Sequence, residues 1–155
     1  MDFPDETALL ISAAEMEVPF VIAAAFSADE ATVTAAQWLA RAAAAAAGIQ
    51  SASIAPLYAA RAGGAYEGLT VPALNLRSQV FDMARTALET AAAMDGAALI
   101  FELARSEQTY TFQRPADYAT SILCGAIAAG WRGPVFIQGD HYQFVAKKYA
   151  VDPEG

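Results

Sequence analysis

The stretch that decides the fold reads Gly133-Pro134-Val135-Phe136-Ile137-Gln138-Gly139-Asp140-His141. Its middle is a short apolar run with β-branched and aromatic residues, bounded by glycines, which is typical of a strand. Because the apolar residues are consecutive rather than alternating, we predict a parallel strand that is covered on both faces. Gly139-Asp140-His141 then marks the exit of this strand into a loop.

The same scheme occurs twice earlier in the chain. Leu69–Asn75 is a short apolar run that ends in a polar residue, and residues 78–94 follow with apolar side chains at helical spacing. A second run, Ala97–Leu103, precedes a polar loop and a helix that we expect between Pro115 and Gly130. Strands that alternate with helices predict an α/β fold with a parallel sheet.

Such strands are joined by right-handed crossovers, so their exits lie on one edge of the sheet. We therefore expect Asn75, Leu103 and Asp140 at the same edge. In doubly wound sheets and in β/α barrels, that edge carries the ligands.

Residues 1–64 differ from the rest because they are rich in alanine and have no alternating β pattern. Ser27-Ala28-Asp29-Glu30 has the form of a capping box that opens a helix, and Gly48 lies where that helix would stop. A turn is expected at Gly63-Gly64. We therefore predict a helical N-terminal extension over 1–64 and a β/α domain over 65–155.

The composition limits the classes of partner. Asp and Glu outnumber Lys and Arg by 17 to 9, and a net charge of −8 would repel a nucleic-acid backbone. No stretch is apolar enough to suggest a membrane span, and acidic residues stand where a secretory signal would be basic. We expect a cytoplasmic protein with no nucleic-acid or membrane partner. The single cysteine, Cys124, lies in an apolar helical stretch and is expected to be an inert core residue.

Asp140 and His141 are the strongest candidates for chemistry. His141 is the only histidine in the sequence, and a lone histidine is more often structural than a ligand. However, a carboxylate and an imidazole side by side just past a parallel strand can hold a cation and move a proton at one substrate. We therefore predict a metal or catalytic site at this pair.

Three further groups at the predicted strand exits have two interpretations each. Glu102 interrupts an apolar strand, so it either pairs with Arg105 for structural reasons or contacts substrate. Asn75 either caps the following helix or reaches a ligand. Arg105 and Ser106 could together bind a phosphate.

Two segments resemble class II fructose-bisphosphate aldolases. Val71-Pro72-Ala73-Leu74-Asn75 is similar to the first strand of that family, and Gly133 to His141, with Ala146-Lys147-Lys148 after it, is similar to the third. The resemblance covers residues 69–149. It implies the first three β/α units of a TIM (β/α)8 barrel, so that residues 65–155 would be a partial barrel domain.

The resemblance also implies a function. In that family a divalent metal, typically Zn2+, is held by three histidines and assists reversible aldol cleavage of a ketose phosphate such as fructose 1,6-bisphosphate. His141 matches the first metal ligand, and Asp140 matches the carboxylate that exchanges a proton with the substrate. Asn75 matches a position that can contact substrate. The sugar phosphate would be a small-molecule partner, and the full-length enzyme is expected to be a homo-oligomer.

The sequence departs from the family in two respects. The exit of the second strand carries Glu102, Arg105 and Ser106 where the family has small residues that help bind phosphate. The other two histidine ligands are missing, so we expect an incomplete barrel, the N-terminal part of a longer enzyme, that is inactive alone. The alternative is a small α/β binding or accessory module without catalysis, in which Asp140 and His141 are structural.

Overall fold

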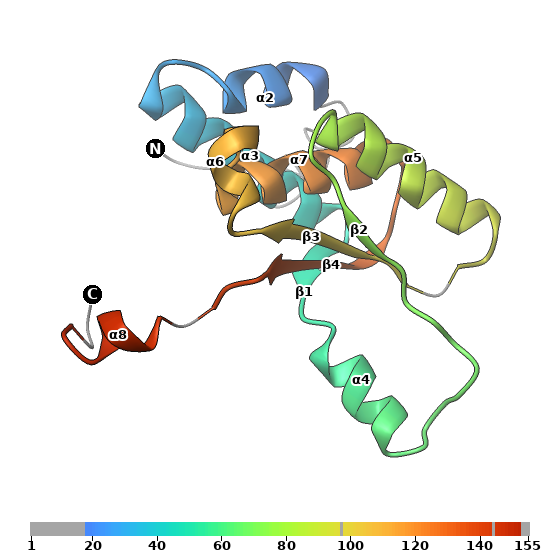
Figure 1. The fold of residues 1–155 in the computed structure, drawn as a ribbon. Helices are drawn as coiled ribbons and strands as arrows, with labels where there is room; N and C mark the ends of the chain where they lie inside the picture. Colours follow the sequence, from blue (N-terminus) through green and yellow to red (C-terminus); the bar gives the residue numbers. More distant parts are fainter. Residues whose placement is uncertain (1–17, 97, 144, 153–155) are drawn as a thin grey trace.

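A computed structural model of the chain describes residues 18–96, 98–143 and 145–152 (Figure 1). The strands are β1 (Ile49–Ala52), β2 (Ala73–Asn75), β3 (Ile100–Ala104) and β4 (Gly133–Asp140). The described helices are α2 (Val18–Ala25), α3 (Glu30–Ala46), α4 (Ala55–Ala62), α5 (Val80–Ala93), α6 (Glu107–Thr111), α7 (Pro115–Ala128) and α8 (Ala146–Tyr149). All strand pairs are parallel, which confirms the predicted α/β class.

The sheet has the order β1-β4-β3-β2. The three predicted strands, now β2, β3 and β4, therefore lie side by side in chain order. The helices α5 and α7 between them are also the predicted ones, and α7 begins at Pro115 as expected. The short helix α6 was not predicted, because its residues were expected to form a polar loop. Within the part of the chain that the structure describes, the sheet is open, with β1 and β2 at its two edges.

The expectation that residues 1–64 are purely helical is wrong at Ile49–Ala52. These four residues form β1, which pairs with β4 from Ile49 opposite Gly133 to Ala52 opposite Phe136. Only Ile49 of this strand is buried, so its sequence carries almost no β pattern. Its position is set by the neighbouring strand, and the backbone N–H of Gly133 donates to the Gly48 carbonyl at 2.9 Å.

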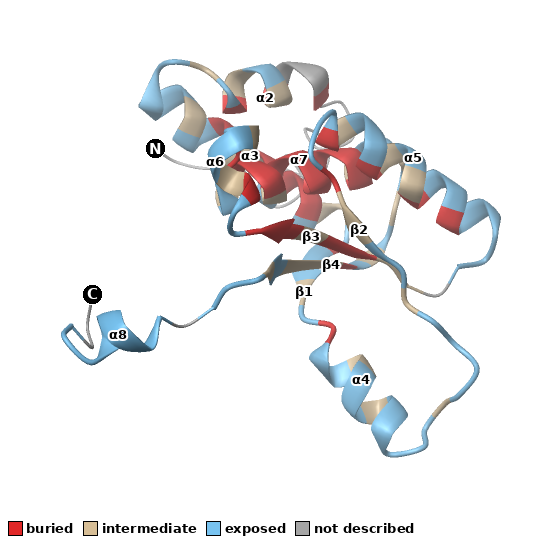
Figure 2. Ribbon diagram, in the orientation of Figure 1, coloured by how far each residue is buried: buried red, intermediate tan, exposed pale blue. Residues whose placement is uncertain are grey.

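The main hydrophobic core lies between the sheet and the helices α5 and α7 (Figure 1). Phe101 and Leu103 of β3 and Val135 of β4 point into this core, where they meet Leu88 and Ile122 from the helices. The central helix α7 is buried on most sides because α5, α3 and α2 also pack against it. Figure 2 shows this burial as the red ribbon of α7 beneath the outer helices.

A second apolar cluster joins α2 and α3 to α7. Ala36 and Ala40 of α3 and Cys124 of α7 are buried in it. The helix α3 begins where the sequence predicted, but its cap is Asp29 rather than Ser27, and the Asp29 carboxylate accepts from the Thr32 backbone N–H at 2.8 Å. The Asp29 carboxylate accepts two hydrogen bonds from Thr32, one from its hydroxyl and one from its backbone N–H, and these hold the pKa of Asp29 below its ordinary value.

Successive side chains of a strand point to opposite faces. Since Phe101 and Leu103 face the helices, Glu102 faces the other side of the sheet, together with Asn75 and Gln138, its register partners on β2 and β4. The helices α4 and α8 extend away from the sheet in Figure 1, and neither buries a residue. The face of the sheet that carries Asn75, Glu102 and Gln138 is therefore the face that the main helix layer leaves open.

Candidate active site

The carboxyl ends of β2, β3 and β4 meet at one edge of the sheet. Asn75, Glu102 and Gln138 form one row across these strands. Ala104 and Asp140 pair two residues further toward the edge, after Leu103 and Gly139. The backbone N–H of Arg105 donates to the Asp140 carbonyl at 3.0 Å, which ties the exit of β3 to that of β4. The predicted convergence of the strand exits is therefore present in the structure.

Asp140 ends β4, and His141 follows it in a left-handed conformation with φ of 53°. This backbone turn brings the two side chains together, with His141 Nε2 3.4 Å from Asp140 Oδ2. The Asp140 side chain is 32% exposed and that of His141 is 70% exposed. His141 therefore faces solvent rather than the hydrophobic interior, where it can reach a ligand.

The described residues do not complete a zinc site. Protein zinc sites have four ligands, of which catalytic sites take three from the protein. Within the described ranges, no group of three or more His, Cys, Asp and Glu side chains is arranged to hold a metal. His141 and Asp140 offer two donors, so a resident metal would need further ligands from elsewhere.

Glu102 is held by Gln138 and not by Arg105. The Gln138 Nε2 donates to Glu102 Oε2 at 3.0 Å across the β3–β4 pair. The Arg105 side chain is exposed and makes no ion pair within the described part of the chain. The structural Glu102–Arg105 pair is therefore a wrong expectation, because the cross-strand neighbour satisfies the carboxylate first.

Asn75 does not cap the helix that follows it. The residue before α5 is Gln79, whereas Asn75 lies at the end of β2 on the open face of the sheet. Its side-chain oxygen is buried and has no hydrogen-bond partner in the described structure. An unpaired buried acceptor is costly, so this oxygen is an exception among the described polar side chains at the strand exits.

An ion pair between the buried Glu107 and the exposed Arg77, which the sequence did not predict, lies beside these residues. Glu107, which is 4% exposed, accepts from Arg77 Nε at 2.6 Å and from the Ala104 backbone N–H at 3.3 Å. Burial alone would raise the pKa of Glu107, but hydrogen bonds from Arg77, Asn75 and Ala104 together hold it below its ordinary value. The pair thus fixes the exits of β2 and β3 relative to one another. Only the position of Arg77, two residues after a predicted strand end, could have drawn attention to it.

Ser106 and Arg105 lie at the exit of β3, where a phosphate-binding role was predicted. Ser106 precedes α6, is exposed, and does not cap the helix with its side chain. The guanidinium of Arg105 is likewise exposed, so both groups are free to meet an anion. Their role in phosphate binding stays a prediction.

A pocket of about 310 Å³ opens beside this edge, between β4 and the start of α7. Tyr118, Gln138 and Tyr142 line it. Burial raises the pKa of Tyr118 to about 12, so its hydroxyl stays protonated and donates to the Glu102 carbonyl at 2.8 Å. The Tyr142 ring lies against Gly139, and its hydroxyl accepts from the Gln108 side chain.

No family model, curated protein or solved structure matches this chain. The chemistry of the site is therefore argued from its own residues. A carboxylate next to an exposed imidazole can exchange protons with a polar ligand and contribute to cation binding. None of the described helices is long and apolar enough to cross a membrane.

Proposed function

We propose that this chain supplies the first three β/α units of a class II aldolase-type barrel and is inactive by itself. The parent enzyme would catalyse the metal-assisted, reversible aldol cleavage of a ketose phosphate such as fructose 1,6-bisphosphate. The observation that carries the proposal is the Asp140–His141 pair, with its side chains 3.4 Å apart and open to solvent at the carboxyl end of β4.

The order of the strands supports this proposal. In a β/α barrel, consecutive strands lie side by side with the helices outside, and the open face becomes the interior. Here β2, β3 and β4 are consecutive and parallel, and α5 and α7 cover one face only. The row of Asn75, Glu102 and Gln138 would then lie inside the barrel, below the site.

Each candidate residue has one proposed role. Asp140 exchanges a proton with the substrate oxygen next to the bond that is cleaved, and His141 is one ligand of the zinc ion. Asn75 and Glu102 contact the polar carbon chain of the substrate. Arg105 and Ser106 bind a phosphate group through charge-assisted hydrogen bonds. The sequence contains one histidine, so the other two histidine ligands must come from outside this chain.

A Co2+ titration followed by absorption spectroscopy tests the metal ligand. We expect weak binding by the chain, its loss in His141→Ala, and no loss in Gln143→Ala, an exposed residue two positions away. Aldol cleavage should be undetectable in all three proteins. Binding that survives His141→Ala would contradict the ligand role, and cleavage by the chain alone would contradict its inactivity.

The coding sequence that flanks this chain tests the barrel itself. The proposal requires further β/α units with two histidines at later strand exits. Flanking units of that kind without any histidine would contradict the reaction class.

A small, self-contained α/β binding module is the second candidate, and one observation favours it. The strand β1 already pairs with the edge of β4 where the next barrel strand would add. This candidate predicts a monomer with a cooperative melting transition, whereas a partial barrel with an exposed sheet edge and apolar surface predicts self-association. Size-exclusion chromatography combined with calorimetry separates the two.

A further inference from the structure

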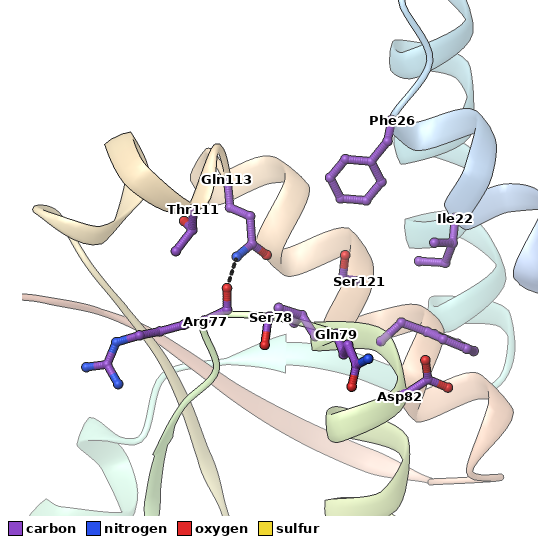
Figure 3. A pocket seen from close by; sticks show the side chains of 11 residues that line it. Ile22, Phe26, Arg77, Ser78, Gln79, Asp82, Thr111, Gln113 and Ser121 are labelled. Atoms are coloured by element: carbon purple, nitrogen blue, oxygen red, sulfur yellow. Dashed lines mark hydrogen bonds between the residues drawn. The ribbon is translucent and has the colours of Figure 1, made fainter.

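A pocket of about 430 Å³ at the start of α5 has its buried polar side chains already paired (Figure 3). Gln113 donates to the Arg77 carbonyl at 3.5 Å, and Ser121 donates to the Asp117 carbonyl at 3.0 Å. Because both side chains have partners, this pocket gives no indication of a particular ligand. The pocket beside β4 differs, since it borders a strand edge that has no partner.

The pocket beside β4, of about 310 Å³, lies on the helical side of the sheet near the end of β1. Leu103 and Ile137, which pack in or against the main core, form part of its lining. Pro115 and Ala119 of α7 line it as well, and Ser51 lines it from β1. The pocket is therefore mainly apolar, and it borders the outer edge of β4.

The backbone of β4 has an unpaired residue next to this pocket. Successive residues of a central parallel strand direct their backbone groups to the two neighbouring strands in turn. The N–H of Gly133 points to the β1 side, and the carbonyl of Asp140 points to the β3 side. By this alternation Gly139 points to the β1 side, but β1 ends opposite Phe136. Within the described ranges, the N–H and C=O groups of Gly139 therefore have no partner strand.

The connection that follows β1 leaves this edge of β4 open. It leads into α4, which begins at Ala55 and extends away from the sheet (Figure 1). No residue of α4 lines the pocket, and Gly139 is exposed. An open strand edge of this kind is a template on which an extended segment of another chain can add.

The pleat of β4 sets the direction of each side chain in an added strand. Paired residues of neighbouring strands point to the same face of a sheet. The residue opposite Gly139 would therefore point, like Leu103 on the other side, toward the helices and into the pocket. Gly139 has no side chain of its own, and the Tyr142 ring lies over it at the rim of the pocket. The apolar lining favours an apolar side chain at this position.

The next position of an added strand would lie beside Asp140. The Asp140 side chain is 32% exposed, and its neighbour His141 is charged only when protonated. No Lys or Arg of the described residues forms an ion pair with Asp140. The net charge of −8 on the whole chain also attracts a cation. A basic residue therefore complements this position, since opposite charges on neighbouring strands attract.

We propose that the end of β4 binds an extended segment of another polypeptide as an added parallel strand. Gly139 donates through its N–H and accepts through its C=O. An apolar residue opposite Gly139 fills the pocket, and a Lys or Arg directly after it pairs with Asp140. This interaction goes beyond the aldolase proposal and does not depend on it, since it needs neither a metal nor a sugar phosphate.

An NMR titration of the isotope-labelled chain with short capped peptides tests the added strand. The probe is acetyl-Ser-Thr-Leu-Lys-Ser-amide, in which Leu lies opposite Gly139 and Lys lies opposite Asp140. One control probe carries Glu in place of Lys. The other carries an N-methyl group on the Lys backbone nitrogen, which removes the N–H that donates to the Gly139 carbonyl.

We expect saturable shifts of the Gly139 amide signal with the Leu-Lys probe and roughly tenfold weaker binding of both control probes. Failure of the Leu-Lys probe to saturate up to about 10 mM, or equal binding of either control probe, would overturn the proposal. Shifts of the Gly139 signal that follow the protein concentration without peptide would also overturn it, because a second copy of the chain would then occupy the edge.

Two variants with matched controls locate the binding. Ala119→Leu fills the pocket from α7, and Ala128→Leu is its control at an exposed position of the same helix. We expect roughly tenfold weaker binding of the Leu-Lys probe in the first and no change in the second. Asp140→Asn should abolish the preference for Lys over Glu, whereas Asp95→Asn, also at an exposed position, should keep it.

Either pair of variants can contradict the proposal. Unchanged affinity in a folded Ala119→Leu chain would show that the peptide does not enter the pocket. A preference for Lys that survives Asp140→Asn would show that the peptide lies elsewhere. If Ala119→Leu does not fold, the comparison of Asp140→Asn with Asp95→Asn still decides.

Discussion

Gly125→Ala is the sharpest test of the helix layer that covers the sheet. Gly125 lies in α7 where that helix crosses α5 most closely. A Cβ atom added there would lie 2.9 Å from the Phe81 carbonyl oxygen and 3.0 Å from the Arg85 backbone nitrogen. These are backbone atoms, so they cannot rotate away, and the two helices must separate.

The expected cost follows from two opposing effects. Overpacking a tight interface costs about 1–3 kcal/mol, and contact with backbone atoms places this site at the upper end. Replacing glycine by alanine inside a helix stabilises the folded state by about 1 kcal/mol, because alanine has the higher helix propensity. The net loss is about 2 kcal/mol, which lowers the melting temperature by about 4–8 °C in a domain of this size.

Differential scanning calorimetry measures this shift, and Gly63→Ala is the matched control. Gly63 ends α4 with φ of −79°, and an added Cβ would lie 3.5 Å from its nearest neighbours, which is ordinary contact. We expect that variant to be unchanged or up to about 1 kcal/mol more stable, because alanine restricts the unfolded chain. If Gly125→Ala melted no lower than Gly63→Ala, the close approach of α5 and α7 would be wrong.

Three further predictions concern single residues. The pKa of Glu107 is lower in the folded chain than its ordinary 4.5, so its stabilisation is present above that pH and is lost as the pH falls through the folded value. Glu107→Gln should therefore lower the free energy of unfolding by about 1 kcal/mol at pH 7 and make the loss of stability at acid pH shallower. An unchanged acid transition would contradict the pairing. Burial raises the pKa of the Cys124 thiol to about 12, so a disulfide reagent at pH 8 should label it only after unfolding, and rapid labelling of the native chain would refute its burial. Gly139→Ala would place a Cβ 2.5 Å from the Tyr142 ring, so we expect the NMR shifts of that ring to change while the melting temperature changes little, and unchanged shifts would contradict the contact.

The sequence predicted the elements with strong patterns. The apolar runs that became β3 and β4 are long enough to show their type, and Pro115 and Gly130 marked the limits of α7. The strand β1 was missed because Gln50 and Ser51 are exposed and its order comes from pairing with β4 rather than from its own residues. Edge strands of this kind have little pattern of their own.

The site was predicted only as far as the strand exits allowed. Parallel strands place their carboxyl ends together, so the proximity of the strand exits at Asn75, Leu103 and Asp140 followed from the order of elements. Side-chain partners did not follow, because Gln138 satisfies Glu102 through cross-strand register, which depends on a hydrogen-bond pattern that a single sequence does not reveal. The Arg77–Glu107 pair joins residues 30 positions apart and was missed for the same reason.

The pairing of β1 with β4 bears directly on the two functional candidates. β1 covers the outer edge of β4 only from Gly133 to Phe136, so Ile137 to Asp140 have a partner on β3 but none on β1. A barrel strand that added at this edge would have to replace β1, which buries a single isoleucine side chain worth about 1.5–3 kcal/mol. A longer strand that paired along the whole of β4 would bury more apolar surface than β1 does. Replacement is therefore energetically accessible, and the presence of β1 does not exclude a barrel. A partial barrel and a self-contained module differ in whether a further strand pairs with Ile137 to Asp140. In a barrel, that strand would also border His141.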